Sequence, residues 1–115
     1  MIVIVSKYLI PKGYAGMALY PFILISDKKY GSNVVIMNHE KIHLRQQAEL
    51  LVIPFYIWYF LEYCLRMVQY KNAYAAYRNI SFEREAYANE KKPDYLKQRR
   101  IFTFTKYISR NHSLE

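Results

Sequence analysis

Cysteine is nearly absent from this chain, since Cys64 is the only one among 115 residues. One thiol excludes both an internal disulfide and a zinc site made of cysteines. Because Cys64 lies within an apolar segment, we expect it to be a small buried residue. Glycine and proline are also scarce, with three and four residues, and there is no repeat or low-complexity segment. The length suits one domain with a modest core.

Acidic residues are few: nine Asp and Glu stand against 17 Lys and Arg, which gives a net charge of +8. Most of the excess comes late in the chain, at Lys91, Lys92, Lys97, Arg99, Arg100, Lys106 and Arg110. We expect this run to be a solvated face, with attraction to anionic lipid or to nucleic acid as the alternatives. Nucleic acid is the weaker of these two, because no known nucleic-acid-binding motif is present.

A secretory signal is not evident either. Residues 2–5 are apolar, but Ser6 and Lys7 interrupt the run and no basic segment precedes it. We therefore expect a cytoplasmic or membrane-associated protein.

Hydrophobic residues make up 53% of the chain and charged residues 23%, which is typical of a folded protein. The most apolar stretch covers residues 50–68, where only Glu62, Arg66 and the tyrosine hydroxyls are polar. Glu62 and Arg66 lie four residues apart, which is the spacing of a helix ion pair. We favour a buried central helix here; contact with a membrane surface and a membrane span are the alternatives.

The secondary structure is expected to change from strands to helices along the chain. Strands are predicted over residues 2–10, 14–20 and 22–26. Helices are predicted over residues 33–53 with a cap at Ser32 or Asn33, then from Pro54 onward, over 71–79, over 82–90 with a cap at Ser81, and over 95–100. For residues 101–108 the pattern does not distinguish a strand from a helix. The expected fold class is α+β, mostly helical, with a short N-terminal β-sheet.

The most specific pattern is His39-Glu40-Lys41-Ile42-His43, the H-E-x-x-H signature of zinc peptidases. Residues four apart lie on one helix face, so His39 and His43 can point at one zinc ion. Glu40 follows the first ligand directly, where its carboxylate can take a proton from a metal-bound water. The alternative is a histidine pair that is solvated or hydrogen-bonded in the core.

A catalytic zinc needs a third protein ligand and keeps its fourth position for water. Metzincins supply this ligand after a glycine turn, but Gln46 stands where that glycine would be. Without the turn, the helix carries Glu49 about 600° around and roughly 9 Å along from His43, away from the ion. Glu83 and Glu85 remain as candidates, although both could simply be solvated helix acids.

At this point the chain resembles the gluzincin metallopeptidases, through His39-Glu40-x-x-His43 and through Glu85-Ala86-x-x-Asn89, which is similar to their E-A-x-x-D motif. The resemblance implies a zincin-like domain over residues 1–115, with the sheet packed on the H-E-x-x-H helix. It also implies Glu85 as third ligand and Asn89 as support for the first histidine. Small or apolar neighbours on the face of Glu85 also favour it over Glu83. The chain is shorter than typical two-lobed members.

The resulting hypothesis is a zinc-dependent peptidase that acts on a peptide or protein substrate. Zinc would be held by His39, His43 and Glu85, with Glu40 as base and Tyr87 or Tyr77 stabilising the oxyanion. The strand over residues 22–26 would be the edge that receives an extended substrate. The alternative is a non-enzymatic basic module that contacts a membrane or a partner, with structural zinc or none.

Overall fold

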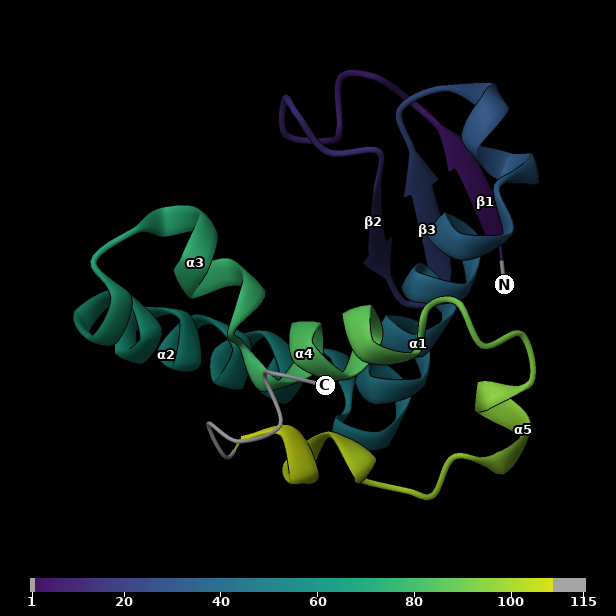
Figure 1. Cartoon of the computed structure of the whole chain (residues 1–115). Helices are drawn as coiled ribbons and strands as arrows, with labels where there is room; N and C mark the ends of the chain where they lie inside the picture. Colours follow the sequence, from purple (N-terminus) through teal and green to yellow (C-terminus); the bar gives the residue numbers. More distant parts are fainter. Residues whose placement is uncertain (1, 109–115) are drawn as a thin grey trace.

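Helix α1 (Val34–Leu50) is the element on which the rest of the molecule packs (Figure 1). The computed structural model describes residues 2–108, so Arg110 of the basic run lies outside the described residues. A three-stranded sheet packs on α1 from one side, while α2 (Val52–Tyr70) and α4 (Ser81–Asn89) pack on it from the others. The predicted α+β class is confirmed, as is the packing of a short N-terminal sheet on the helix that carries the histidines.

The sheet consists of β1 (Ile2–Val5), β2 (Gly16–Leu19) and β3 (Phe22–Ile25) in the order β1-β3-β2. β1 is parallel to β3, and β2 is antiparallel to it. β1 is shorter than the predicted strand over residues 2–10. The strand that we expected at the edge, β3, has a neighbour on both sides, so the edge beside α1 belongs to β2.

Helix α1 begins as predicted, because the Asn33 side chain accepts a hydrogen bond from the Ile36 N–H. The short helix η1 (Lys28–Ser32) leads into it. Leu51, with a φ of 64°, ends α1, and α2 (Val52–Tyr70) continues at an angle of 111°. Pro54 lies in the first turn of α2, where its missing N–H costs nothing.

The remaining helices are α3 (Ala73–Arg78), α4 (Ser81–Asn89), α5 (Tyr95–Gln98) and η2 (Thr103–Tyr107). Ser81 was expected to cap α4, but it is the first residue of the helix. Its hydroxyl and its N–H both donate to Glu62 of α2, each over 2.7 Å. A side chain of α2 therefore satisfies the start of α4.

Two apolar clusters flank the histidine motif. Ala18, Ile23, Ile25 and Leu44 join the sheet to α1. Phe55, Ile80, Phe82 and Phe104 join α2, α4 and η2. Helix α1 is held from both sides, which fixes the direction of its side chains.

Helix α2 is not the buried central helix that we favoured for residues 50–68. Its only buried residues are Phe55, Glu62 and Arg66. Cys64 is exposed, so its predicted burial is also wrong. Among the described residues no single helix is both long and apolar enough to cross a membrane; α1 and α2 pass that test only as a bent pair.

Candidate metal centre

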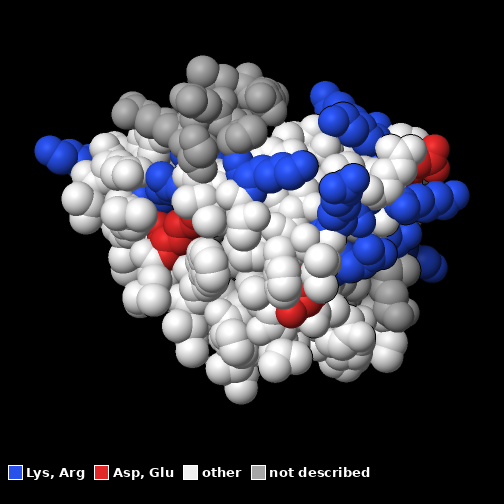
Figure 2. Space-filling view, turned by 90° about the horizontal axis from the view of Figure 1, so that it is seen from below, with Lys and Arg blue, Asp and Glu red and all other residues white. Residues whose placement is uncertain are grey.

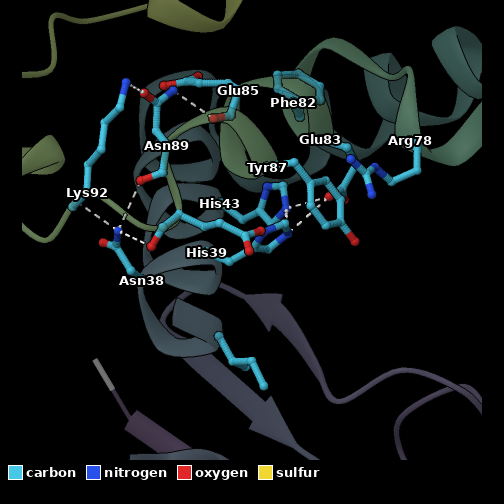
Figure 3. A network of polar contacts seen from close by, with 12 residues as sticks. Asn38, His39, His43, Arg78, Phe82, Glu83, Glu85, Tyr87, Asn89 and Lys92 are labelled. Atoms are coloured by element: carbon cyan, nitrogen blue, oxygen red, sulfur yellow. Dashed lines mark hydrogen bonds and ion pairs between the residues drawn. The ribbon is translucent and has the colours of Figure 1, made fainter. Parts of the chain in front are cut away.

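Helices α1 and α4 bring three ligand atoms together at the centre of the molecule (Figure 3). The Nε2 atoms of His39 and His43 lie 3.1 Å apart. Glu83 of α4 places its Oε1 at 3.2 Å from His39 Nε2 and at 3.0 Å from His43 Nε2. All three side chains are buried, so they meet away from bulk water.

The hydrogen-bond partners of the two imidazoles determine which nitrogen of each ring is free. His43 Nδ1 lies 2.8 Å from Gln46 Oε1. The Gln46 amide group donates to the Phe82 carbonyl and to Glu85, so its oxygen must be the atom that faces His43. His39 Nδ1 lies 2.9 Å from a carboxylate oxygen of Glu90, which can only accept from it. In both neutral rings Nδ1 therefore carries the proton, and Nε2 keeps a lone pair.

Three acceptor atoms thus converge with no donor between them, which is unfavourable unless positive charge sits among them. Ligands bound to zinc at about 2.0–2.1 Å in tetrahedral geometry lie roughly 3.3 Å from one another. The separations of 3.0–3.2 Å here differ from that value by only a few tenths of an ångström. The group formed by His39, His43 and Glu83 can hold a metal ion.

The pKa values of these groups also indicate that positive charge is favoured at this position. Burial alone would lower the pKa of His39, but hydrogen bonds to Glu83 and Glu90 raise it to about 10. Burial opposes the charged form of His43 as well, yet the Glu83 carboxylate raises its pKa. Burial would raise the pKa of Glu83, whereas the two histidines lower it strongly. A metal-free site therefore takes up protons where a cation would otherwise bind.

No family model, curated protein or solved structure matches this chain. The metal centre is therefore defined by its geometry. That geometry combines two imidazoles and one carboxylate, the donor types that suit zinc and related divalent ions.

Glu40 is the acidic residue of the site whose carboxylate is not engaged by the protein. It is only 7% exposed and lines the same cavity as the two histidines and Glu83. Among the described residues, no side chain or backbone group forms a hydrogen bond with its carboxylate. Burial raises its pKa, against the opposing effect of the histidines. Glu40 is therefore a buried carboxylate in the cavity wall that has no hydrogen-bond partner of its own in the described part of the chain.

The structure does not bring Glu85, our expected third ligand, to the histidines. Glu83 and Glu85 point to different sides of α4 (Figure 3). The Glu85 carboxylate accepts hydrogen bonds from Gln46, Tyr95 and Arg99 instead. Arg99 neutralises its charge within the core, so Glu85 has a complete set of partners without a metal.

Asn89 likewise does not support the first histidine. Its amide donates to the Glu85 carbonyl and to the Tyr107 hydroxyl. The supporting residue is Glu90, and Asn38 holds Glu90 in place by donating to its carbonyl over 2.9 Å. Glu83, Tyr87 and Glu90 follow one another at spacings of four and three residues, which places them along one helix face, and this spacing was the available signal for the arrangement.

A cavity of about 400 Å³ opens beside the metal centre. Its walls are mostly apolar and aromatic, and they include Gly16, Met17 and Ala18 of β2. Of the two tyrosines that we considered as oxyanion donors, Tyr77 lines the cavity and Tyr87 does not. Tyr87 packs its ring on His39, with 4.5 Å between ring centres, and its hydroxyl lies 2.9 Å from that of Tyr77.

Two further residues of the site were missed by sequence reasoning. Tyr59 of α2 donates to the second carboxylate oxygen of Glu83 over 2.8 Å. Gln46, three residues after His43, orients that histidine. The i, i+3 spacing puts Gln46 beside His43, but the direction of its amide depends on the Phe82 carbonyl and on Glu85 of α4. The role of Tyr59 depends on how α2 packs beside α4.

Proposed function

We propose that this protein is a zinc-dependent metallopeptidase of the gluzincin type, with His39, His43 and Glu83 as the metal ligands. The observation that carries the proposal is the convergence of three buried lone-pair atoms next to an unengaged carboxylate, Glu40. A histidine pair that serves only the core would have to hold a proton between these acceptors, whereas a metal ion would supply the positive charge directly.

The chain's own residues account for the geometry of such a centre. Glu90 and Gln46 orient the two histidines through Nδ1, and Tyr59 orients Glu83 through Oε2. When bound there, zinc would supply a Lewis acid that polarises the scissile carbonyl and lowers the pKa of a water. Three protein ligands leave one position for that chemistry.

Glu40 is placed to act as the general base. Its free carboxylate, in the cavity beside the ligands, can accept a proton from the attacking water and return it to the leaving amine. Tyr77 lies in the cavity wall and can donate a hydrogen bond to the carbonyl oxygen as negative charge develops on it.

The edge of β2 offers a place for an extended peptide. Residues alternate along a strand, so the backbone groups of Gly16 and Ala18 point away from β3. The Ala18 carbonyl confirms this direction, because it accepts from Gln47 and Tyr56 on the side opposite β3. A substrate strand that pairs with Gly16 would lie along the cavity and place apolar side chains against its walls.

The experiment that tests the proposal separates binding from catalysis. Purified protein is expected to bind about one zinc per chain by elemental analysis and to cleave an unstructured protein such as casein. Glu40→Gln should keep the zinc and lose the cleavage, because an amide cannot serve as the base. Tyr77→Phe should keep the zinc and lower kcat by about 10²-fold or more. Full activity of Glu40→Gln, or full zinc occupancy of His39→Ala and His43→Ala, would overturn the proposal.

A further inference from the structure

Helix α2 carries its apolar side chains on the outside. Ile53, Phe60, Leu61 and Val68 are each between 62% and 75% exposed, and Ile57 and Leu65 are more than half exposed. These residues lie on the arc of the helix opposite Phe55, which faces the core. No Asp, Glu, Lys or Arg lies among them.

The two charged residues of α2 are turned inward instead. Glu62 is 6% exposed and holds the start of α4 through Ser81. Arg66 is 4% exposed and donates to the Ile108 carbonyl over 2.9 Å. A helix on the surface of a water-soluble protein has the opposite arrangement, with its charges in water and its apolar stripe on the core. The polarity of α2 is that of a helix with a non-aqueous phase outside it.

Basic residues gather next to this face. Lys91, Lys92, Arg100 and Lys106 surround one hollow of the surface. Ile108, two residues after Lys106, lines a second hollow with Trp58, Leu61 and Leu65 of α2. Figure 2 shows that lysine and arginine lie mainly in the upper and right-hand parts of the molecular face viewed from below, next to a broad area with few charged residues. The basic hollow and the apolar hollow on α2 are thus linked by the short segment from Lys106 to Ile108.

We propose that the exposed face of α2 docks in the plane of an anionic lipid bilayer surface. The apolar side chains would enter the boundary between headgroups and acyl chains, and the neighbouring lysines and arginines would contact anionic headgroups. The net charge of +8 favours this occupant over a second copy of the chain, since two copies would bring like charges together. This inference does not depend on the metal centre.

The test is flotation of the purified chain with vesicles of phosphatidylcholine, with and without phosphatidylserine. The protein is expected to float with the anionic vesicles and more weakly with the neutral ones, and added salt should reduce the difference. Trp58, the single tryptophan and 39% exposed, reports the contact directly. Its fluorescence emission should shift to shorter wavelength as anionic vesicles are added.

One variant places negative charge on the exposed face of α2, and a control variant places it elsewhere on the surface. Ile57→Glu combined with Leu61→Glu should lower the vesicle affinity by at least about tenfold, because two charges would enter the apolar boundary. Val34→Glu changes an equally exposed residue at the far end of α1, and it should leave binding unchanged. Circular dichroism verifies that all variants are folded.

Three outcomes would overturn the proposal. The first is absence of flotation with either vesicle, and the second is equal binding by the doubly charged variant and by Val34→Glu. The third is a wild-type dimer in light scattering that becomes monomeric in the doubly charged variant while neither protein binds vesicles, since the face would then belong to a second copy of the chain.

Discussion

Both carboxylate oxygens of Glu83 have a defined role. Oε1 faces the two histidines, and Oε2 accepts from Tyr59. A carboxylate held at both ends loses little freedom when it binds a cation, so Glu83 would need little rearrangement to act as a ligand. The side chains of His39 and His43 are fixed in the same way through Nδ1.

The first prediction concerns the third ligand. Glu83→Gln is expected to lower zinc affinity by about 10²-fold or more, because a neutral amide replaces an anionic ligand. Glu85→Gln should change the affinity little, since Glu85 does not reach the histidines. Competition with a chromophoric chelator measures both. If Glu85→Gln lost zinc and Glu83→Gln kept it, the ligand would be Glu85 and the helix α4 would have to turn.

The second prediction concerns Glu90, which accepts from His39 Nδ1 over 2.9 Å. Glu90→Gln should weaken zinc binding by about 10–100-fold, because the imidazole loses the carboxylate that orients it and increases its basicity. Glu40→Gln is the matched control, being a Glu-to-Gln change beside the histidines at a residue that forms no hydrogen bond with either imidazole. Equal affinities of the two variants would show that Glu90 does not act on the metal centre.

At the scale of elements, Arg99 forms a bridge between α1 and α4 from outside both helices. Its guanidinium pairs with Glu49 of α1 and with Glu85 of α4, and the side chain is completely enclosed. The residue comes from the segment after α5, so that segment closes over the two helices. Removing one member of a buried ion network leaves the others without compensation, which costs more than the network itself contributes.

Arg99→Met is therefore expected to lower the free energy of unfolding by about 3–5 kcal/mol, because two buried carboxylates lose their shared cation. Arg100→Met, at the next and exposed position, should change it by less than about 0.5 kcal/mol. Urea unfolding followed by circular dichroism gives both values. A loss at Arg99 no larger than that at Arg100 would show that Glu49 and Glu85 find other partners.

On the scale of the whole molecule, the candidate metal centre lies between the two apolar clusters. One cluster joins the sheet to α1, and the other joins α2 to α4 and η2. The ligands come from α1 and α4, so a bound ion would connect the two halves. Metal binding to the folded chain alone must then add to the stability of the whole.

Zinc at about 1,000 times its dissociation constant should stabilise the folded protein by roughly 4 kcal/mol. The melting temperature of wild type should therefore rise with added zinc and fall again with a chelator. His39→Ala and His43→Ala should melt at a temperature that is independent of zinc. A parallel rise in these variants would mean that zinc stabilises the protein from another position.

Local features of the sequence determined most of the secondary structure and half of the site. The Asn33 cap, the i and i+4 spacing of the histidines and the position of Glu40 after His39 all depend on neighbours within one or two helical turns. Such features are the same in the isolated sequence and in the fold. The helix, the histidine pair and the cavity-facing Glu40 were predicted for that reason.

Tertiary structure alone decided which of Glu83 and Glu85 faces the histidines. Glu85 is paired with Arg99, which lies 14 residues further along the chain, and it therefore points away from them. Tertiary structure also decided which strand forms the edge, since strand order depends on the crossover between β1 and β3 and not on the composition of either strand. The apolar character of α2 is evident in the sequence, but the sequence does not show which side of the helix faces the core. Residues 50–68 carry apolar side chains on nearly every side. The side that faces outward was determined by the contacts of Glu62 with Ser81, of Arg66 with Ile108 and of Phe55 with Phe82 and Phe104.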